Sequence, residues 1–314
     1  MTKILFIFFF SVNLCYSQTY KDDSLVVRSI LDSIGLNSIS VNDVAVISVN
    51  SGRISFLYLD NKNINKLPGI IGDLTKLVRL DLYDNNLQKL PYEIGNLNSL
   101  RTLNIRNNKL LNLPIQIGGM TSLKKLYLSH NLLDSLPREI GNLDSLSELD
   151  VSSNNLITLP REIGNLDNLW FLHLGLNDIE LLPNEIGQLT YLGKLYLNDN
   201  QLKELPIEIT NIRDFDFVQT GEMSHEGYYE LSLARNYICD VADTLKNWLD
   251  EFEEDWWETQ SCSTSLSEKY GYKKEEPESC GPTCGPANIM LLIIPFVGKL
   301  GSARKKIRKI IKWS

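Results

Sequence analysis

The sequence lacks the residues and motifs by which most enzymes and nucleic-acid-binding proteins are identified. Its 314 residues include only three histidines, five cysteines and four methionines. It contains no glycine-rich nucleotide loop, no nucleophile elbow, no HExxH zinc motif and no N-x-[ST] sequon. The net charge is −8, and residues 299–314 hold seven basic side chains without an acid, so the rest carries −15. An acidic body argues against nucleic acid as a partner. We therefore predict no catalytic residue, no cofactor and no metal site.

Long apolar runs are also missing. The two longest are Ile4–Phe10 and Ile289–Val297, close to the two ends of the chain. Both are shorter than the ~20 residues that a transmembrane helix needs.

What the sequence does contain is a repeat. Apolar residues recur every 23 residues, at Ile54, Leu77, Leu100, Leu123, Leu146, Leu169 and Leu192. Each unit reads LxxLxLxxNxLxxLPxxIGxLxx, and a fixed period of this length predicts a solenoid. Leu80 and Leu82 are two residues apart, so they face inward on an extended segment. Arg79, Asp81 and Tyr83 then face outward.

An asparagine and a proline also recur in the units. The asparagines are expected at the bend after each strand, bonded to buried backbone of the next turn; they are Asn85, Asn108, Asn131, Asn154, Asn177, Asn200 and Asn236. Prolines such as Pro137 end the strands, and the segment that follows, Glu139 to Leu143, is expected to form a short helical turn. No unit can bury its apolar face alone, so the units must stack.

These motifs resemble the leucine-rich repeat over about Ile54 to Ile238, in the 23-residue LPxxIGxL class of Ras-suppressor-like scaffold proteins that is also common in bacterial surface proteins. The resemblance implies an α/β leucine-rich repeat solenoid, a curved horseshoe. A parallel sheet would form its concave face and short helical or 3-10 turns its convex face. The array would span residues 54–238 in about eight repeats, with an insertion at 212–229. Lys62 replaces the asparagine in the first repeat.

The N-terminal segments predict export and a cap. Residues 1–17 resemble a secretory signal peptide cleaved after Ser17. A lipoprotein signal that uses Cys15 is the alternative, although Asn13-Leu14 is a poor lipobox, and a signal anchor is disfavoured by length. Residues 18–53 are expected to cap the array, with an amphipathic helix from Asp22 to Ile34 and an irregular or strand-like lead-in after it.

The C-terminal segments predict a second cap and a tether. Residues 239–262 resemble the cysteine-bearing caps of secreted repeat proteins, which implies a disulfide between Cys239 and Cys262. Residues 263–286 are expected to form a linker. It ends in the motif Cys280 to Cys284, whose two cysteines would form either a disulfide or a metal-binding pair. Residues 287–314 resemble bacterial C-terminal sorting signals. An interfacial membrane segment is the alternative.

The outward face of the sheet is the expected binding surface. Aromatic residues recur there beside charged ones, as in protein-binding hot spots. The candidate partner-binding residues are Tyr83, Arg106, Lys125, Tyr127, Asp150, Phe171, His173, Lys194 and Tyr196. Strand propensity alone also enriches tyrosine.

The resulting hypothesis is a bacterial protein exported to the cell envelope, the cell surface or the medium. It would bind a protein on its concave face without catalysis, and reach a membrane or sorting machinery through its tail. The alternatives are an intracellular signalling scaffold and a carbohydrate-binding accessory protein that recognises polysaccharide.

Overall fold

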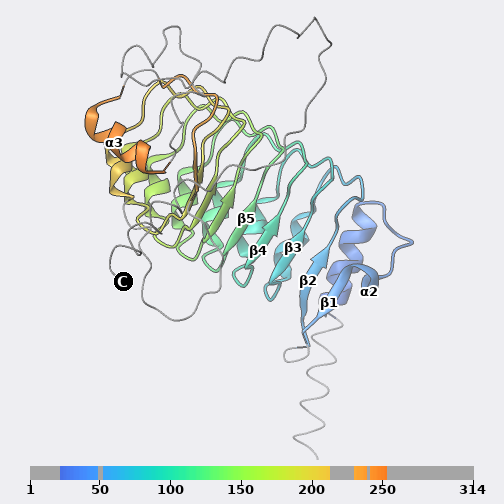
Figure 1. The fold of residues 1–314 in the computed structure, drawn as a ribbon. Coiled ribbons are helices and arrows are strands. Elements are labelled where there is room, and N and C mark those ends of the chain that lie inside the picture. Colours follow the sequence, from blue (N-terminus) through green and yellow to red (C-terminus); the bar gives the residue numbers. More distant parts are fainter. Residues whose placement is uncertain (1–21, 49–51, 213–229, 239–240, 253–314) are drawn as a thin grey trace, which may run out of the picture. The chain divides into compact units, whose positions relative to one another are not determined.

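The computed structural model describes residues 22–48, 52–212, 230–238 and 241–252, all within one compact unit, Met1–Gly271. A second unit, Tyr272–Ser314, lies wholly outside these residues. The described strands form one sheet whose spatial order follows the chain (Figure 1). They are β1 Ala45–Ile47, β2 Ile54–Tyr58, β3 Arg79–Asp81, β4 Thr102–Asn104, β5 Lys125–Tyr127, β6 Glu148–Asp150, β7 Phe171–His173, β8 Lys194–Tyr196 and β9 Glu230–Ser232.

The register of the sheet follows the sequence period. From β2 to β8 each parallel pair joins residues 23 apart, so Leu80 pairs with Leu103 and Leu103 with Leu126. Leu80, Leu103 and Leu126 are 0% exposed. Leu195 pairs with Leu231 across the longer interval that includes the insertion. The predicted leucine-rich repeat solenoid is confirmed.

Short 3-10 turns form the opposite side of each repeat. They are η1 Gly69–Asp73, η2 Tyr92–Asn96, η3 Ile115–Gly119, η4 Arg138–Asn142, η5 Arg161–Asn165, η6 Asn184–Gln188 and η7 Ile207–Asn211. An extended proline precedes each turn, such as Pro137 before η4, because its fixed φ suits the entry to a helical turn. Glycine permits neighbouring turns to touch: a Cβ on Gly141 would lie 2.3 Å from the carbonyl oxygen of Glu162.

The asparagines form a ladder, but they bond to the preceding repeat and not to the next one as predicted. Asn131 Oδ1 accepts from the backbone N–H of Leu110 at 3.0 Å, and its Nδ2 donates to the carbonyl of Ile105 at 2.9 Å. The carbonyl of Leu128, in its own repeat, accepts at 2.9 Å. Asn131 is 5% exposed. The first repeat has no repeat before it, which is consistent with Lys62 at the equivalent position.

The N-terminal segment covers the start of the array. A helix over residues 22–33 buries Val27, Ile30 and Leu31 completely, while Leu25 is 67% exposed. Asp23 Oδ1 lies 2.7 Å from Arg53 Nη2, and its Oδ2 accepts from the N–H of Ile54 at 2.9 Å. This buried contact ties the helix to β2.

The lead-in differs in detail from the expectation of an irregular or strand-like segment. It contains a one-turn helix, α2 Val41–Val44, followed by β1, which pairs antiparallel with β2. Ser40 and Asp43 form a capping box at the start of α2, and such a box satisfies backbone N–H groups that the turn leaves free.

At the other end of the array, α3 Asp243–Phe252 packs against η7. It buries Leu245, Trp248 and Leu249. Several predicted features lie outside the described residues: the signal peptide at 1–17, the insertion beyond Ile212, the Cys239–Cys262 disulfide, and residues 263–314. None of the helices that the structure describes has the length and hydropathy to span a bilayer.

Candidate functional site

The nine candidate residues lie along one face of the sheet, on or directly after strands β3 to β8. They come from six successive repeats: Tyr83 after β3, Arg106 after β4, Lys125 and Tyr127 on β5, Asp150 on β6, Phe171 and His173 on β7, and Lys194 and Tyr196 on β8. All are half-buried except Asp150, which is only 5% exposed. Asp150 occupies an outward position of β6, but neighbouring side chains cover it almost completely.

Arg106 reaches across two strands and binds the buried Asp150. Its Nη2 lies 2.8 Å from Asp150 Oδ2, its Nε donates to the Ser129 hydroxyl at 3.1 Å, and its guanidinium carbon is 4.1 Å from the centroid of the Tyr127 ring. Burial alone would raise the pKa of Asp150, but hydrogen bonds from Ser152 and Arg106 lower it below its ordinary value. Asp150 is therefore an ionised and buried partner of Arg106, although the sequence suggested it as a residue that contacts a binding partner.

Lys125 and Tyr127 are engaged by one carboxylate on the next strand. Lys125 Nζ lies 2.7 Å from Glu148 Oε1, and the Tyr127 hydroxyl donates to Glu148 Oε2. Burial and this hydrogen bond raise the pKa of Tyr127, so its hydroxyl stays protonated. The sequence reasoning missed Glu148, although the 23-residue period places it directly beside Lys125. The charged groups of β4 to β6 thus satisfy one another.

Three aromatic side chains on β7 and β8 touch each other, and we call Phe171, His173 and Tyr196 the aromatic cluster. The ring centroids are 6.2 Å apart for Phe171 and His173, 5.7 Å for Phe171 and Tyr196, and 5.0 Å for His173 and Tyr196, with interplanar angles of 78°, 55° and 61°. Tilted and edge-to-face contacts of this kind are favourable for aromatic rings. The three half-exposed side chains form one surface.

Gly175 and Asn198 extend this surface beyond the strand ends, and sequence reasoning did not select either. A Cβ on Gly175 would lie 2.8 Å from Asn198 Oδ1 and 3.1 Å from His173 Nε2. The missing side chain therefore leaves room for an imidazole nitrogen and an amide oxygen beside the rings. Gly175 is buried, and glycine beside a strand often marks a site that another group approaches closely.

His173 is held in its neutral form at neutral pH. Burial lowers the pKa of His173 below its ordinary 6.5, and the positive charge of Arg106 lowers it further, while Asp150 opposes both effects. His173 Nδ1 lies 3.5 Å from Asp150 Oδ1. The aromatic cluster is consequently uncharged near pH 7.

The remaining candidates, Tyr83 and Lys194, contact groups outside the cluster. The carboxylate of Asp60 raises the pKa of the half-buried Tyr83. Lys194 Nζ is 5.6 Å from the centroid of the Trp170 ring. A second aromatic pair lies on β2, where the Phe56 and Tyr58 centroids are 6.5 Å apart. Sequence reasoning therefore placed nine residues on one face, and three of them form a continuous aromatic surface.

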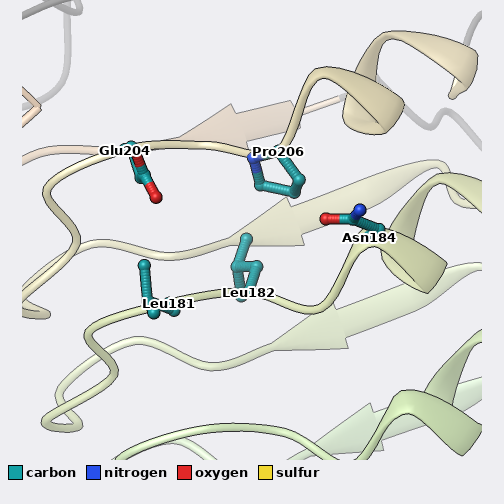
Figure 2. A pocket seen from close by; sticks show the side chains of 5 residues that line it. All are labelled: Leu181, Leu182, Asn184, Glu204 and Pro206. Carbon is teal, nitrogen blue, oxygen red and sulfur yellow. The ribbon is translucent and has the colours of Figure 1, made fainter.

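No group of three or more metal-ligating side chains occurs in the part of the chain that the structure describes. A pocket of about 190 Å³ lies away from the sheet face, between the repeats of β7 and β8 (Figure 2). Its lining consists of Leu181, Leu182, Asn184, Glu204 and Pro206. It is smaller than the ~300–1,000 Å³ of common small-molecule sites.

Two family models match parts of this chain. Residues 49–131 match the model of a leucine-rich repeat region, and residues 114–156 match a leucine-rich repeat model. The chain therefore contains leucine-rich repeats. Domains of this kind generally mediate protein interactions. No curated protein matches the leucine-rich repeat chain.

Several solved structures resemble this chain. An LRR protein of Leptospira interrogans has 33% identity and a TM-score of 0.52 over 59% of this chain and 44% of its own. The PEPR1–AtPEP1 structure has 25% identity and a TM-score of 0.53 over 60% of this chain and 30% of its own. An internalin of Listeria monocytogenes shares the fold, with 20% identity and a TM-score of 0.53 over 72% of this chain and 59% of its own. The chain thus spans less than half of the first two relatives.

Proposed function

We propose that this leucine-rich repeat protein is an exported, non-catalytic recognition protein that binds another protein through its aromatic cluster. One contrast carries the proposal. The charged side chains of β4 to β6 pair with one another, whereas Phe171, His173 and Tyr196 form an uncharged aromatic surface, half-exposed on the rigid sheet. Aromatic side chains anchor protein interfaces because they bury a large apolar area and lose little conformational freedom.

The shape and charge of the cluster favour a protein partner over a polysaccharide. The rings are tilted by 55° to 78° to one another, so they present edges as well as faces, and a flat sugar ring does not lie across them. Asn198 and His173 Nε2 lie beside the rings and supply polar groups. An apolar side chain of the partner, flanked by its backbone amides, fits this combination. The relative with AtPEP1 in its structure supports the same class of ligand.

The proposal of export is based on the sequences at the two ends of the chain. Residues 1–17 have the order of a secretory signal, and residues 287–314 combine an apolar segment with a basic one, as in a membrane or sorting tail. The similarity to a Leptospira protein supports a bacterial origin. N-terminal sequencing of the mature protein tests this part: a start at Gln18 is expected. An intact Met1 with reduced Cys239 and Cys262 would favour the intracellular scaffold.

The binding proposal is tested with a double substitution and a matched control. Phe171→Ala with Tyr196→Ala removes the cluster, and Phe56→Ala with Tyr58→Ala removes the other aromatic pair of the same face. The partner is captured by the wild-type protein from native envelope, and its affinity for each form is measured by calorimetry. We expect the cluster variant to lose at least about 30-fold in affinity, equivalent to roughly 2 kcal/mol for an interface anchor.

The control pair should leave the affinity within about threefold, since surface changes outside the anchors contribute little. Both double variants should lose similar stability because both remove half-buried rings. Equal affinity losses in the two variants would contradict a site at the cluster. Capture of glycans that disappears with Tyr127→Ala and Phe171→Ala would favour carbohydrate recognition instead.

A further inference from the structure

Gly175 interrupts a row of side chains that crosses the sheet face. The residue two positions after each parallel strand forms this row, which consists of Asp60, Tyr83, Arg106, Ser129, Ser152, Gly175, Asn198 and Ala234. Side chains of the row bind within the protein: the Ser129 hydroxyl accepts from Arg106 Nε at 3.1 Å, and the Ser152 hydroxyl donates to Asp150 at 2.7 Å. At Gly175 the row has no side chain to make such a contact.

Two hydrogen-bond acceptors converge on the space beside Gly175. Asn198 Oδ1 lies 2.8 Å, and His173 Nε2 3.1 Å, from the position that a Cβ on Gly175 would take. We call these two atoms the acceptor pair. A methyl group at that position would press against both atoms, so their approach to each other depends on glycine.

The neighbours of the acceptor pair fix which atoms face Gly175. Asn198 Nδ2 donates to Asp199 Oδ2 at 2.7 Å, which turns the amide oxygen toward Gly175. His173 Nδ1 lies 3.5 Å from Asp150 Oδ1. A neutral imidazole keeps its proton on the nitrogen beside a carboxylate, so Nε2 carries a lone pair. Among the described residues, neither atom of the pair accepts a hydrogen bond.

The cationic side chains of this chain that lie near the pair bind elsewhere. Arg106 Nη2 is 2.8 Å from Asp150, Arg235 Nη2 donates to Asp199 at 2.6 Å, and Lys194 Nζ is 5.6 Å from the centroid of the Trp170 ring. A donor for the acceptor pair is therefore expected from another molecule.

The surroundings of the pair favour a donor that carries a positive charge. The ring centroid of Tyr196 is 5.0 Å from that of His173, and aromatic rings attract cations. Asp150 raises the pKa of His173 more than Arg106 lowers it, so the field of this ion pair favours positive charge at the imidazole. The net charge of −8 attracts cations over a longer range.

We propose that the acceptor pair binds the ammonium group of a lysine side chain of the partner. This inference rests on the proposed function, because it names the chemical group that the aromatic cluster receives. One N–H of the ammonium donates to Asn198 Oδ1, a second donates to His173 Nε2, and the third faces solvent. The methylene groups of the lysine pack on Phe171 and Tyr196, since the stem of a lysine is apolar.

The binding of a lysine side chain is tested with a small probe and the full chain. n-Butylammonium has the stem and the ammonium group of lysine, and it is titrated at constant ionic strength at about pH 7.5, where His173 is neutral. Imidazole signals are followed by NMR after isotope labelling of the three histidines, and His173→Phe identifies the His173 signal. We expect this signal to shift with saturation and a Kd on the order of 10 mM, as for a small fragment.

Two matched probes separate hydrogen bonding from charge and from apolar contact. n-Butyltrimethylammonium keeps the stem and the charge but has no N–H group, and n-butanol keeps the stem but has no charge. Each should bind at least about tenfold more weakly than n-butylammonium, because it loses the charge-assisted hydrogen bonds.

Two variants test the acceptor pair itself. Asn198→Ala removes one acceptor, whereas Gly175→Ala adds a methyl group against both and removes no polar atom. Gly175 does not have a positive φ, so alanine suits its backbone. Each variant should bind n-butylammonium about tenfold more weakly. Asn104→Ala is the matched control, since Asn104 is also half-buried on this face, and it should change the affinity by less than about twofold.

Three results would overturn the lysine proposal: no saturating shift up to about 100 mM n-butylammonium, equal affinity for n-butyltrimethylammonium, or equal losses in Asn198→Ala and Asn104→Ala. Unchanged signals of the other two histidines show that each variant is folded. The probes act without the partner, so the two proposals can fail separately. If the Phe171→Ala, Tyr196→Ala protein loses the partner but n-butylammonium does not bind to the wild type, the proposed function stands and the lysine proposal is wrong.

Discussion

Replacement of Asn131 by alanine measures how much one ladder asparagine stabilises the array. The change removes three buried hydrogen bonds: one accepted from Leu110 N–H, and one donated to each carbonyl of Ile105 and Leu128. The two carbonyls still accept from other ladder amides, Asn108 at 3.2 Å and Asn154 at 3.1 Å. The Leu110 N–H has no other described partner.

The expected cost follows from this difference. A buried N–H left without a partner costs about 1–3 kcal/mol, and each bond lost from a carbonyl that keeps a second donor costs about 0.5–1.5 kcal/mol. We therefore expect Asn131→Ala to lower the free energy of unfolding by about 2–6 kcal/mol. The exposed neighbour Asn155 uses only its backbone, so Asn155→Ala should change it by less than about 0.5 kcal/mol.

Urea unfolding, followed by circular dichroism and by tryptophan fluorescence, gives both values. For Asn131→Ala the urea concentration at the unfolding midpoint should fall, while the slope of the unfolding free energy against urea concentration should stay unchanged. The transitions followed by the two probes should coincide. A loss under about 1 kcal/mol would refute the reasoning, because it would mean that water or relaxation replaces the amide at no cost.

Two further substitutions test the electrostatics of the sheet face. Arg106→Ala should lower the free energy of unfolding by about 1–3 kcal/mol, because it leaves the buried Asp150 without its ion pair. The control Arg101→Ala changes an exposed side chain and should be nearly neutral in the same urea assay. Equal losses in the two variants would show that the contact between Arg106 and Asp150 contributes nothing to stability. His173 has a lowered pKa, so the unfolded chain binds its proton more readily: the stability that neutral His173 provides is complete above about pH 6.5 and declines as the pH falls below it. His173→Gln should make the free energy of unfolding less steep between about pH 7 and 5, and an unchanged slope would contradict the assignment.

The fold could be predicted because the repeats share one pattern of leucine, asparagine and proline positions. Leu80, Leu103 and Leu126 pair at the spacing that the sequence shows, and a shift by one residue would expose them all. The short helix α2 in the N-terminal lead-in was harder to predict, although Ser40 and Asp43 have the spacing of a capping box. A short box in a segment without apolar periodicity is a weak signal.

The arrangement of the site could be predicted only in part. Sequence period places side chains on a face, but it does not say how far a long side chain reaches. Arg106 passes its neighbour on β5 and binds Asp150 on β6, which depends on the length of arginine and on burial. Phe171, His173 and Tyr196 were predictable as neighbours, because β7 and β8 pair in register. Their mutual contacts follow from rotamers that only the packed structure fixes.

Site-specific photo-crosslinking tests the central claim most directly, namely that the aromatic cluster holds the partner. A photoreactive phenylalanine analogue replaces Phe171 in one protein and Phe56 in another, both half-exposed on the same sheet face. We predict a covalent adduct with the captured envelope protein from position 171 and little or none from position 56. Adducts from position 56 alone, or equal adducts from both positions, would contradict binding at the cluster.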